Sequence, residues 1–553
     1  MSSIPEDHSD IDTIVRSTVT RREFLAEATA ATVSLMVLPA LARAATSASF
    51  DFYISPTGSD ANPGTAAQPW SPASLGLAAS SSTSGVQTQS SQVVANQAQM
   101  AGKRIGLLPG NYVPSTFVTG IPGGYGTYFQ FKASGPSATQ PTILQSTTPL
   151  GAVFSMSPGV TGTSFVQTSG TGDLLWLSCN NVVVDGISFN YSNTGAFIRL
   201  TDTGAGTGNN ITIQNCEFKN LDVSTLYGGS HDNVAAIEMH EVGDAEGSGL
   251  TVRNCYFNTV LNGGHVLDSL SFNANCIGGF QYTNITIDHC EFANAFSAFY
   301  PKGKCGYYKF TNNFVHDCLA MMRDANEVWP QYNSPVNANA PRNVIANNVA
   351  YNVGGIASGS GGNPAQCNVD VYNNTICFSG ANGFRQYQIY SATTDSAYGS
   401  AVRPTTSKFY NNIMFNLGTA NVPTYWFVTT GLPYNQVFAE MKYNCHDTHG
   451  FTFSDSYSGT TKTTLASWQS FSGYDLQSFQ ALPKFSGTPS SADPTQVKLA
   501  AGSPCLGTGR TTGTASGSAC DMGAWGGANP PTQIGCNLKQ GLAVPMAPSL
   551  IVS

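Results

Sequence analysis

Apolar and polar positions alternate in short runs along the middle of the chain, and each run leads to an Asn or a Cys. Nearly the same phrase recurs seven times between residues 211 and 414, at irregular intervals. The seven segments are 211–218, 250–257, 285–292, 308–315, 344–350, 369–376 and 407–414. Each segment predicts a short strand, a bend and a second strand. Such repeats are typical of a coiled stack of strands, and a globular alternation of strands and helices would not produce them.

The Asn and Cys positions predict a single column of side chains at one bend. In a parallel β-helix, successive strands lie about 4.8 Å apart, so equivalent side chains lie above one another. A buried Asn can then pass amide hydrogen bonds to the next Asn, and a Cys can act as a small apolar filler. The expected column is Cys216, Cys255, Cys290, Asn313, Asn348, Asn374 and Asn412. Insertions fall in loops at the bends, where we expect function.

These repeats resemble the right-handed parallel β-helix proteins of the pectate-lyase-like superfamily. Segments near both ends are similar to the opening and closing segments of secreted bacterial members: 52–65, 68–70, 107–112, 497–505 and 521–525. The resemblance implies an all-β fold, a right-handed parallel β-helix solenoid with an N-terminal cap and a C-terminal segment packed on the helix. It specifies architecture better than activity, because one scaffold can carry unrelated chemistries.

We expect one elongated domain after an export signal, because each turn of a solenoid adds its own core. The expected divisions are a twin-arginine signal peptide at 1–44, an entry strand and N-terminal cap at 45–110, the parallel β-helix at 111–450, and C-terminal turns and a tail at 451–553.

The export signal is predicted from Arg21 and Arg22, followed by a run of mostly small and apolar residues. Residues 42–44, Ala-Arg-Ala, are a plausible cleavage site. A cytoplasmic helix or a membrane anchor is the alternative, but the run is short and rich in Ala and Thr. We therefore expect a periplasmic or secreted protein, with no membrane contact in its mature form.

The net charge limits the possible binding partners, and the cysteine spacing limits the possible metal sites and disulfides. The formal net charge is −8, which speaks against bulk attraction to nucleic acid or anionic membranes. An acidic sugar polymer remains compatible if a local cationic site or a bound cation receives it. The 13 cysteines lack the paired Cys-x-x-Cys spacing of a zinc site. Cys505 and Cys520 are the best disulfide candidates, with free thiols as the alternative.

Candidate chemistry lies on the second strand of each turn, where alternation sends every other residue outward. Aligning the segments by their apolar positions gives one outward column of His240, Lys302, Asp324 and Tyr387, and a neighbouring column of Glu238, Tyr300, Met322 and Arg385. Long segments at 221–233, 258–270, 325–341 and 388–406 would border this strip. The alternative is that Lys302 and Asp324 form only a cross-strand ion pair on a solvated face.

The resemblance suggests polysaccharide cleavage, and β-elimination from a uronate polymer is the leading hypothesis. Such a lyase neutralises the uronate carboxylate and removes a proton from the adjacent carbon. Lys302 would be the base, and nearby cationic groups would lower its proton affinity. The candidate catalytic residues are Lys302, Arg323, His240 and Arg385; the candidate substrate-binding residues are Tyr300, Tyr387 and Trp329; the candidate ligands for Ca²⁺ are Glu238 and Asp324. We expect a monomer acting on a polysaccharide.

Three alternatives stay open: a glycoside hydrolase, an epimerase, and a non-catalytic carbohydrate-binding or adhesive solenoid. A hydrolase needs two carboxyl groups about 5 to 10 Å apart, for which Glu238, Glu241 and Asp324 are candidates. The Asp motifs of the β-helix polygalacturonases and a Trp-x-Asp-His lyase segment are absent from the sequence. His316 and Asp317 form either a catalytic pair or a turn feature. The turn is favoured, because Asp288–His289 is expected at the equivalent bend one turn earlier.

Overall fold

The computed structural model describes most of the repeat region and its two ends. The described residues are 49–76, 80–81, 87–114, 118–121, 125–155, 172–192, 196–200, 208–221, 235–239, 247–260, 275–279, 282–301, 305–323, 342–353, 356–358, 369–378, 386–388, 408–418, 424–427, 439–449, 452–455, 459–510, 520–527 and 530–538. Residues 50–543 form one compact unit, and all elements named below belong to it. The predicted signal peptide lies outside the described residues.

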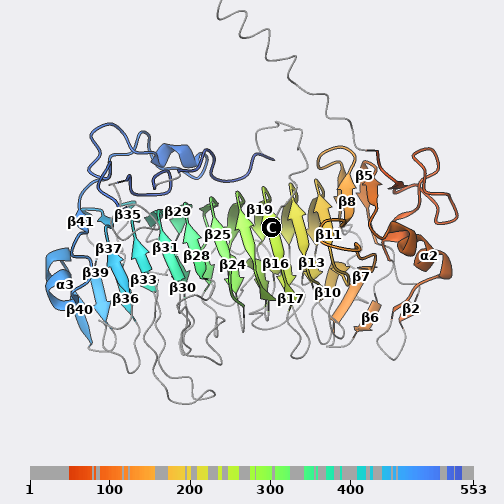
Figure 1. Ribbon diagram of the computed structural model, residues 1–553, viewed down its shortest axis with the longest axis horizontal. Helices are drawn as coiled ribbons and strands as arrows, with labels where there is room; N and C mark the ends of the chain where they lie inside the picture. The colour runs from red at the N-terminus through yellow and green to blue at the C-terminus, as the bar shows by residue number, and fades with distance from the viewer. Residues whose placement is uncertain are drawn as a thin grey trace, which may run out of the picture. The chain divides into compact units, whose positions relative to one another are not determined.

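Three long sheets, here called sheets 1, 2 and 3, form the body of this unit (Figure 1). Sheet 1 has 12 strands: β1 (Phe52–Ile54), β4 (Arg104–Leu107), β8 (Thr142–Ser146), β11 (Val182–Asp185), β14 (Ile211–Gln214), β18 (Leu250–Arg253), β22 (Thr286–Asp288), β25 (Lys309–Thr311), β28 (Asn343–Ala346), β31 (Val369–Tyr372), β34 (Lys408–Tyr410) and β37 (Glu440–Lys442). Sheet 2 has 12 strands: β5 (Gly110–Tyr112), β9 (Ala152–Phe154), β12 (Ser188–Ser192), β15 (Glu217–Leu221), β19 (Tyr256–Val260), β23 (Glu291–Ala295), β26 (Phe314–His316), β29 (Val349–Val353), β32 (Thr375–Phe378), β35 (Ile413–Asn416), β38 (Cys445–His446) and β41 (Phe479–Gln480). Sheet 3 has nine strands: β6 (Val118–Ile121), β7 (Tyr125–Phe131), β10 (Gly172–Leu177), β13 (Ala196–Leu200), β16 (Ala235–Met239), β20 (Asn275–Gly279), β24 (Ser297–Pro301), β27 (Ala320–Arg323) and β30 (Ala357–Ser358).

Smaller elements complete the unit. A four-stranded sheet contains β33 (Gln386–Gln388), β36 (Thr424–Phe427), β39 (Thr452–Asp455) and β40 (Thr460–Lys462); the remaining strands pair as β17 (Gly247–Ser248) with β21 (Tyr282–Thr283) and β2 (Ser80–Ser81) with β3 (Gln87–Thr88). The helices are α2 (Ser91–Met100), α3 (Leu465–Ser472) and the 3-10 turns η1 (Pro72–Leu75) and η5 (Pro494–Val497). Figure 1 shows α2 at the end of the stack where the sheets begin and α3 at the other end. Among the described residues, no helix has the length and apolar character needed to cross a membrane.

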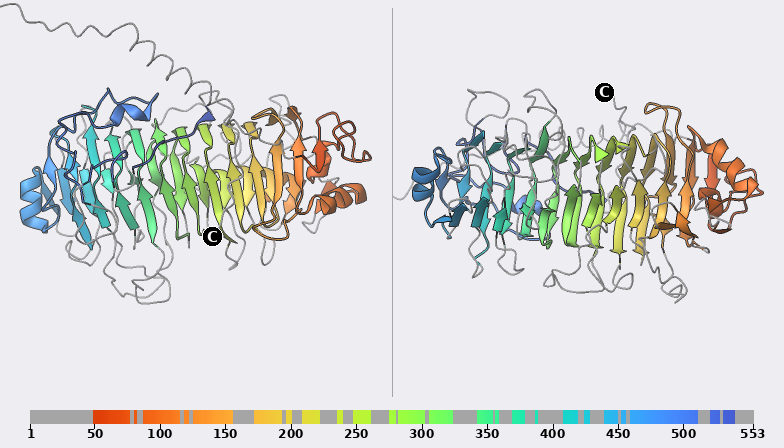
Figure 2. Two further views of the ribbon diagram at one scale, coloured as in Figure 1. Left: turned by 45° about the horizontal axis from the view of Figure 1, so that its top comes forward. Right: turned by 90° about the horizontal axis from the view of Figure 1, so that it is seen from below.

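In the middle of the stack, each coil contributes one strand to each of the three sheets, so that strands far apart in sequence pair in parallel. The coil of β14, β15 and β16 is followed by β18, β19 and β20, and each strand pairs with its counterpart. Both further views show the same stacking (Figure 2). In sheet 3 the β6–β7 pair is antiparallel. The predicted fold class, a parallel β-helix with an N-terminal cap and a packed C-terminal segment, is confirmed.

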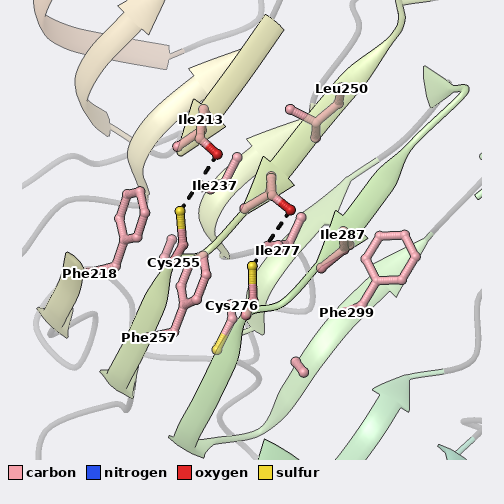
Figure 3. Packing of buried hydrophobic residues seen from close by; sticks show 14 of the residues in the cluster. Ile213, Phe218, Ile237, Leu250, Cys255, Phe257, Cys276, Ile277, Ile287 and Phe299 are labelled. Atoms are coloured by element: carbon pink, nitrogen blue, oxygen red, sulfur yellow. Dashed lines mark hydrogen bonds between the residues drawn. The ribbon is translucent and has the colours of Figure 1, made fainter. Parts of the chain in front are cut away.

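The inside of the coil is a continuous apolar core in which equivalent residues lie above one another. On sheet 2 the rings of Phe189, Phe218, Phe257 and Phe292 stack with centroids 4.9, 4.7 and 4.9 Å apart. Figure 3 shows Phe218 and Phe257 in this column. Isoleucines and aromatic residues of the other two sheets fill the remaining space. The alternation seen in the sequence therefore reflects inward residues at every second position of a strand, such as Ile211 and Ile213 of β14.

The predicted Asn and Cys column lies at the bend between sheets 1 and 2. Asn374 Nδ2 donates to the carbonyl of Ile345, one coil away, at 2.9 Å. Cys255 Sγ donates to the equivalent carbonyl, that of Ile213, at 3.6 Å (Figure 3). A Cys thus makes the same contact as an Asn, and the Cys255 thiol is also hydrogen-bonded to those of Cys216 and Cys290. Asn444, which the repeats did not include, also joins the column, because its Oδ1 accepts the backbone N–H of Asn412 at 3.0 Å.

The bend needs two residues, because the residue before each column residue has its own backbone requirement. The position before each column residue has a positive φ: Asn215, Asn254, His289, Asn312, Asn347, Asn373 and Asn411 lie between 49° and 58°. Asn is among the few non-glycine residues that adopt this left-handed conformation at low cost. The first residue of the pair therefore sets the backbone bend, and the second provides the stacked hydrogen bonds.

The C-terminal tail, defined here as residues 483–538, covers the outer face of sheet 2 over its later strands (Figures 1 and 2). Val497, Ala524 and Ile534 pack on Phe314 and Val349. The earlier strands β12 and β15 instead have partly exposed polar residues on that face. On β32 and β35, the outward residues Cys377, Ile413 and Phe415 are apolar and pack against the tail.

Candidate functional site

The outer face of sheet 3 carries a row of large and ionisable side chains. Trp176, Arg199, Glu238, Gly278 and Tyr300 occupy paired positions on the successive strands β10, β13, β16, β20 and β24. We call these five residues the outer row. The neighbouring positions Ile237, Ile277 and Phe299 belong to the core, as Figure 3 shows. The strand pairing puts Glu238 and Tyr300 in one row with Gly278 between them. Both side chains are buried, and Tyr300 also packs with the core.

Arg199 is the centre of a buried group of three charges. Its Nε lies 2.5 Å from Asp173 Oδ2, and its Nη2 lies 2.9 Å from Glu238 Oε2. The three side chains are at most 3% exposed. The guanidinium therefore links carboxylates from the strands on either side of its own. Charged groups this deeply buried are costly unless they are paired, as they are here.

Burial changes the acidity of both carboxyl groups. The pKa of Asp173 is raised above its ordinary value by desolvation, which Arg199 opposes and the nearby charge of Glu238 reinforces. Desolvation also raises the pKa of Glu238 against the effect of Arg199. One guanidinium does not balance two buried carboxylates, so the group favours holding a proton near neutral pH. A carboxyl group that keeps its proton near neutral pH is a possible proton donor.

The predicted alignment of the later strands is wrong by one residue. Phe299 pairs with Met322, whereas the apolar pattern had aligned it with Met321. Both methionines are buried, so hydrophobicity alone does not show which of them pairs with Phe299. Met322 is consequently in the inward column and not in the outward one. The backbone of Arg323 then takes the position after Tyr300 in the outer row.

Several predicted site residues lie outside the part of the chain that the structure describes: Lys302, His240, Arg385, Trp329 and Asp324, together with most of the long bordering segments. Tyr387 is described only by its backbone, and its strand β33 belongs to the four-stranded sheet. Among the described residues, no cluster of three or more His, Cys, Asp or Glu side chains could hold a metal ion. Glu238 and Tyr300 are the predicted site residues whose side chains are described, and they occupy one row of sheet 3 with Gly278 between them.

Sequence reasoning missed three residues of this site: Asp173, Arg199 and Trp176. Their strands, β10 and β13, precede the recognisable repeats. The sequence contained one indication of this buried site: Arg199 interrupts the apolar run of residues 196–200. An Arg in a strand with this much apolar character is rarely buried unless a carboxylate pairs with it.

A second polar cluster lies on sheet 2 at the edge of the tail. His316 Nε2 lies 3.1 Å from Glu291 Oε1, and its Nδ1 lies 2.9 Å from Asp317 Oδ2. Cys536 of the tail contacts the same Glu291. The expected equivalence with Asp288–His289 is wrong, because His289 occupies the bend between sheets 1 and 2, whereas Asp317 follows the sheet 2 strand β26. Both pairs nevertheless include a residue with positive φ at a turn.

No family model and no curated protein matches the chain. Among solved structures, it is similar to a complex of XylC with xylose, with 10% identity, a TM-score of 0.42, and 79% of this chain and 87% of that chain covered. It is also similar to the pectate lyase Pel9A, with 17% identity, a TM-score of 0.36 and coverages of 86% and 95%. A rhamnogalacturonan lyase matches with 15% identity, a TM-score of 0.33 and coverages of 67% and 83%.

The fold rests on the chain's own topology. Three sheets built by in-register parallel pairing, a stacked apolar core and an Asn and Cys column at one bend are all present in the described residues. The chain therefore has a parallel β-helix fold.

Proposed function

We propose that this protein is an exported carbohydrate-active enzyme that cleaves a uronate-containing polysaccharide by β-elimination. The observation that supports this function is the outer row of sheet 3, because its members repeat at the strand spacing of about 4.8 Å. A linear array of this kind is suited to a linear polymer. Trp176 and Tyr300 lie on either side of the paired Arg199 and Glu238 in this row, and all four residues are at most 4% exposed.

The elimination needs positive charge near the uronate carboxylate and a base near the proton on the adjacent carbon. Arg199 is already paired with Asp173 and Glu238, so we assign the positive charge to Arg323, whose backbone follows Tyr300 in the row. Lys302 comes directly after β24, the strand that carries Tyr300. We assign the base to Lys302, with His240 and Arg385 as further catalytic candidates and Tyr387 and Trp329 as sugar-binding candidates.

Hydrolysis is the second candidate function, and one observation favours it. Asp173 and Glu238 are two carboxyl groups on the same guanidinium, and burial raises the pKa of both. A hydrolase requires one protonated and one ionised carboxyl group on either side of the bond. In this alternative Asp173 would be the acid, and the products would carry new reducing ends without unsaturation.

Calcium belongs to the elimination proposal as an option for neutralising the substrate. Glu238 already binds Arg199, so a calcium ion would need Asp324 and substrate oxygens as further ligands. Loss of activity with a chelator, restored by added Ca²⁺, would support this role. Unchanged activity after chelation would mean that arginine side chains neutralise the substrate carboxylate without Ca²⁺.

The decisive experiment incubates the mature protein with pectate, alginate and glycosaminoglycans while the absorbance of unsaturated ends is followed. We expect absorbance to appear with one of them and Lys302→Ala to lower the rate at least about a hundredfold. Lys309→Ala is the matched control, because Lys309 is exposed on sheet 1. New reducing ends without absorbance would indicate that the enzyme hydrolyses the polymer and does not cleave it by elimination. Retention of sugar with neither signal would indicate a binding protein.

Export and oligomeric state are tested separately. We propose that Arg21 and Arg22 direct the chain through the twin-arginine pathway. Replacing both with Lys should keep the protein in the cytoplasm, and export of that variant would contradict the proposal. Sedimentation should give the mass of a monomer for the mature chain.

A further inference from the structure

Two thiols meet where the C-terminal tail covers the last coils of the stack. Cys445 lies on the outer side of β38, and Cys505 comes from the tail. Both are completely buried and pack together with Ile413 and Met522. Neither is part of a disulfide, so the expected Cys505–Cys520 bond is absent. The backbone N–H of Met522 donates to the carbonyl of Cys505 at 3.0 Å, which fixes this part of the tail.

The two sulfur atoms are direct neighbours. Their thiols are hydrogen-bonded to each other, and this bond, followed by burial, raises the pKa of Cys445. Cys445 Sγ also lies 3.5 Å from the carbonyl of Ala481. A hydrogen bond between two thiols requires the sulfur atoms to approach within reach of a small side-chain rotation, which is the geometry that disulfide formation needs.

We propose that Cys445 and Cys505 form a disulfide in an oxidising compartment and lock the C-terminal tail onto the end of the β-helix. The inference is independent of the proposed enzymatic function. It assigns a covalent modification to two residues that the folded chain already holds together. The reduced protein does not need to refold for the bond to form, which suits a chain that folds before it is oxidised.

The chemistry is a two-step exchange with a small disulfide such as oxidised glutathione. The thiolate of Cys505 attacks the small disulfide, which forms a mixed disulfide and releases one thiol. The thiolate of Cys445 then attacks the Cys505 sulfur and releases the second thiol. Two protein thiols are oxidised, one small disulfide is reduced to two thiols, and the two protons stay with the released thiols.

Access controls the rate of this reaction. The thiolate is the reacting species, and the raised pKa of Cys445 keeps it scarce in the closed protein. Cys505 is buried under its own turn, so the oxidant reaches it only when the tail lifts from sheet 2. Local openings of a peripheral segment require less free energy than global unfolding. Oxidation is therefore slow in the closed state and faster in mild denaturant.

Cys520 is the competing partner for Cys505. Its side chain is only partly buried, and its Sγ donates to the carbonyl of Arg510 at 2.9 Å. Cys520 also contacts Asn411 Nδ2 at 3.5 Å. These contacts hold its sulfur toward the bend between sheets 1 and 2, whereas Cys505 lies against β38. The geometry favours Cys445 over Cys520 as the partner.

The test uses the full mature protein, purified with reductant and then exposed to oxidised glutathione with and without urea below the unfolding transition. Free thiols are alkylated, and peptides are mapped by mass spectrometry without reduction. We expect a linked pair containing Cys445 and Cys505, about 2 Da lighter than the two free peptides, forming faster with urea. The midpoint of thermal unfolding should rise by about 2 to 6 °C and fall again with reductant.

Two variants separate the possible pairings. Cys520→Ser should leave the Cys445–Cys505 link and the thermal shift intact. Cys505→Ser should abolish both. Recovery of a Cys505–Cys520 link, or complete alkylation of Cys445 and Cys505 after oxidation in urea, would overturn the proposal. The peptide map of the unsubstituted protein decides the question even if a variant fails to fold.

Discussion

Arg199 and Glu238 lie on the neighbouring strands β13 and β16 and form a buried ion pair with a distance of 2.9 Å. Taking both groups out of water is costly, so each depends on the other for compensation. Asp173 binds the same guanidinium from the opposite side. The pair therefore supports the packing of three strands and also provides the main charge of the outer row.

Replacing Arg199 with Leu should destabilise the protein strongly, because it leaves two buried carboxyl groups without a counter-charge. We expect the free energy of unfolding to fall by about 3 to 5 kcal/mol near neutral pH. The loss should shrink in acid, where both groups take up protons. Urea unfolding followed by fluorescence at two pH values measures both effects.

Arg253 is the matched control for Arg199. It lies partly exposed on the outer face of sheet 1, and its Nε donates to Gln214 Oε1 at 2.8 Å. Arg253→Leu should cost about 1 kcal/mol or less. An equal loss in the two variants would show that the buried group has no special role in stability.

The fold could be predicted from the sequence because each coil repeats the same local requirements. Alternating inward residues, a left-handed Asn and a column residue recur within a few positions, so a single segment such as 250–257 shows them all. Insertions change the number of residues between successive repeats without changing the repeated motif itself. The tail was likewise expected to pack on the stack, and it does so on sheet 2.

The site was less predictable because register in sheet 3 is set after loops of variable length. Two adjacent buried methionines, Met321 and Met322, gave no signal for the pairing with Phe299. Asp173 and Arg199 come from strands without the repeat phrase, and their meeting depends on the pairing of β10 with β13. Such a contact is a property of the stack and cannot be read from either segment alone.

Asn374 provides a direct test of the hydrogen-bonded column. Its Oδ1 accepts from Asn348 Nδ2 at 2.9 Å, and its own amide donates to Ile345. Asn374→Ala leaves buried backbone and side-chain groups unpaired, so we expect a loss of about 2 to 4 kcal/mol in the free energy of unfolding. Chemical denaturation measures the loss.

Asn374→Cys should lie between the original protein and Asn374→Ala. The thiol can donate to the carbonyl of Ile345, as Cys255 donates to that of Ile213. Its sulfur is only a weak acceptor for Asn348 Nδ2, which donates to Asn374 Oδ1 in the original protein. Equal stability of the Ala and Cys variants would mean that the donated hydrogen bond contributes little.

Met522 should anchor the tail through apolar contact. It is 1% exposed and packs on Ile413 and Cys445, so Met522→Ala should cost about 2 to 4 kcal/mol. The loss should appear first as faster proteolysis within the tail, because the tail can open without the coils. Leu506 belongs to the same tail but is 37% exposed, and Leu506→Ala should cost less than about 1 kcal/mol. Similar proteolysis of the two variants would contradict this anchoring role.

His316 should make the docking of the tail depend on pH. Burial opposes protonation of the imidazole, but hydrogen bonds and charges from Asp317 and Glu291 outweigh it and raise the pKa of His316 above 6.5. Asp317 also accepts from Asn352 Nδ2 at 2.6 Å, and its own pKa is lowered. The imidazolium therefore binds two carboxylates at the edge where Cys536 of the tail contacts Glu291.

Because the folded pKa of His316 lies above the unfolded one, its contribution to stability is complete below pH 6.5 and is lost as pH rises through the folded value. His316→Gln keeps hydrogen-bonding capacity without the charge, so the difference in unfolding free energy between protein and variant should shrink from about pH 6 to about pH 9. Urea titrations of both proteins across this range measure the difference, and other titrating groups cancel in it. A difference that stays constant with pH would show that His316 is neutral in the folded protein and that its carboxylate contacts are ordinary hydrogen bonds.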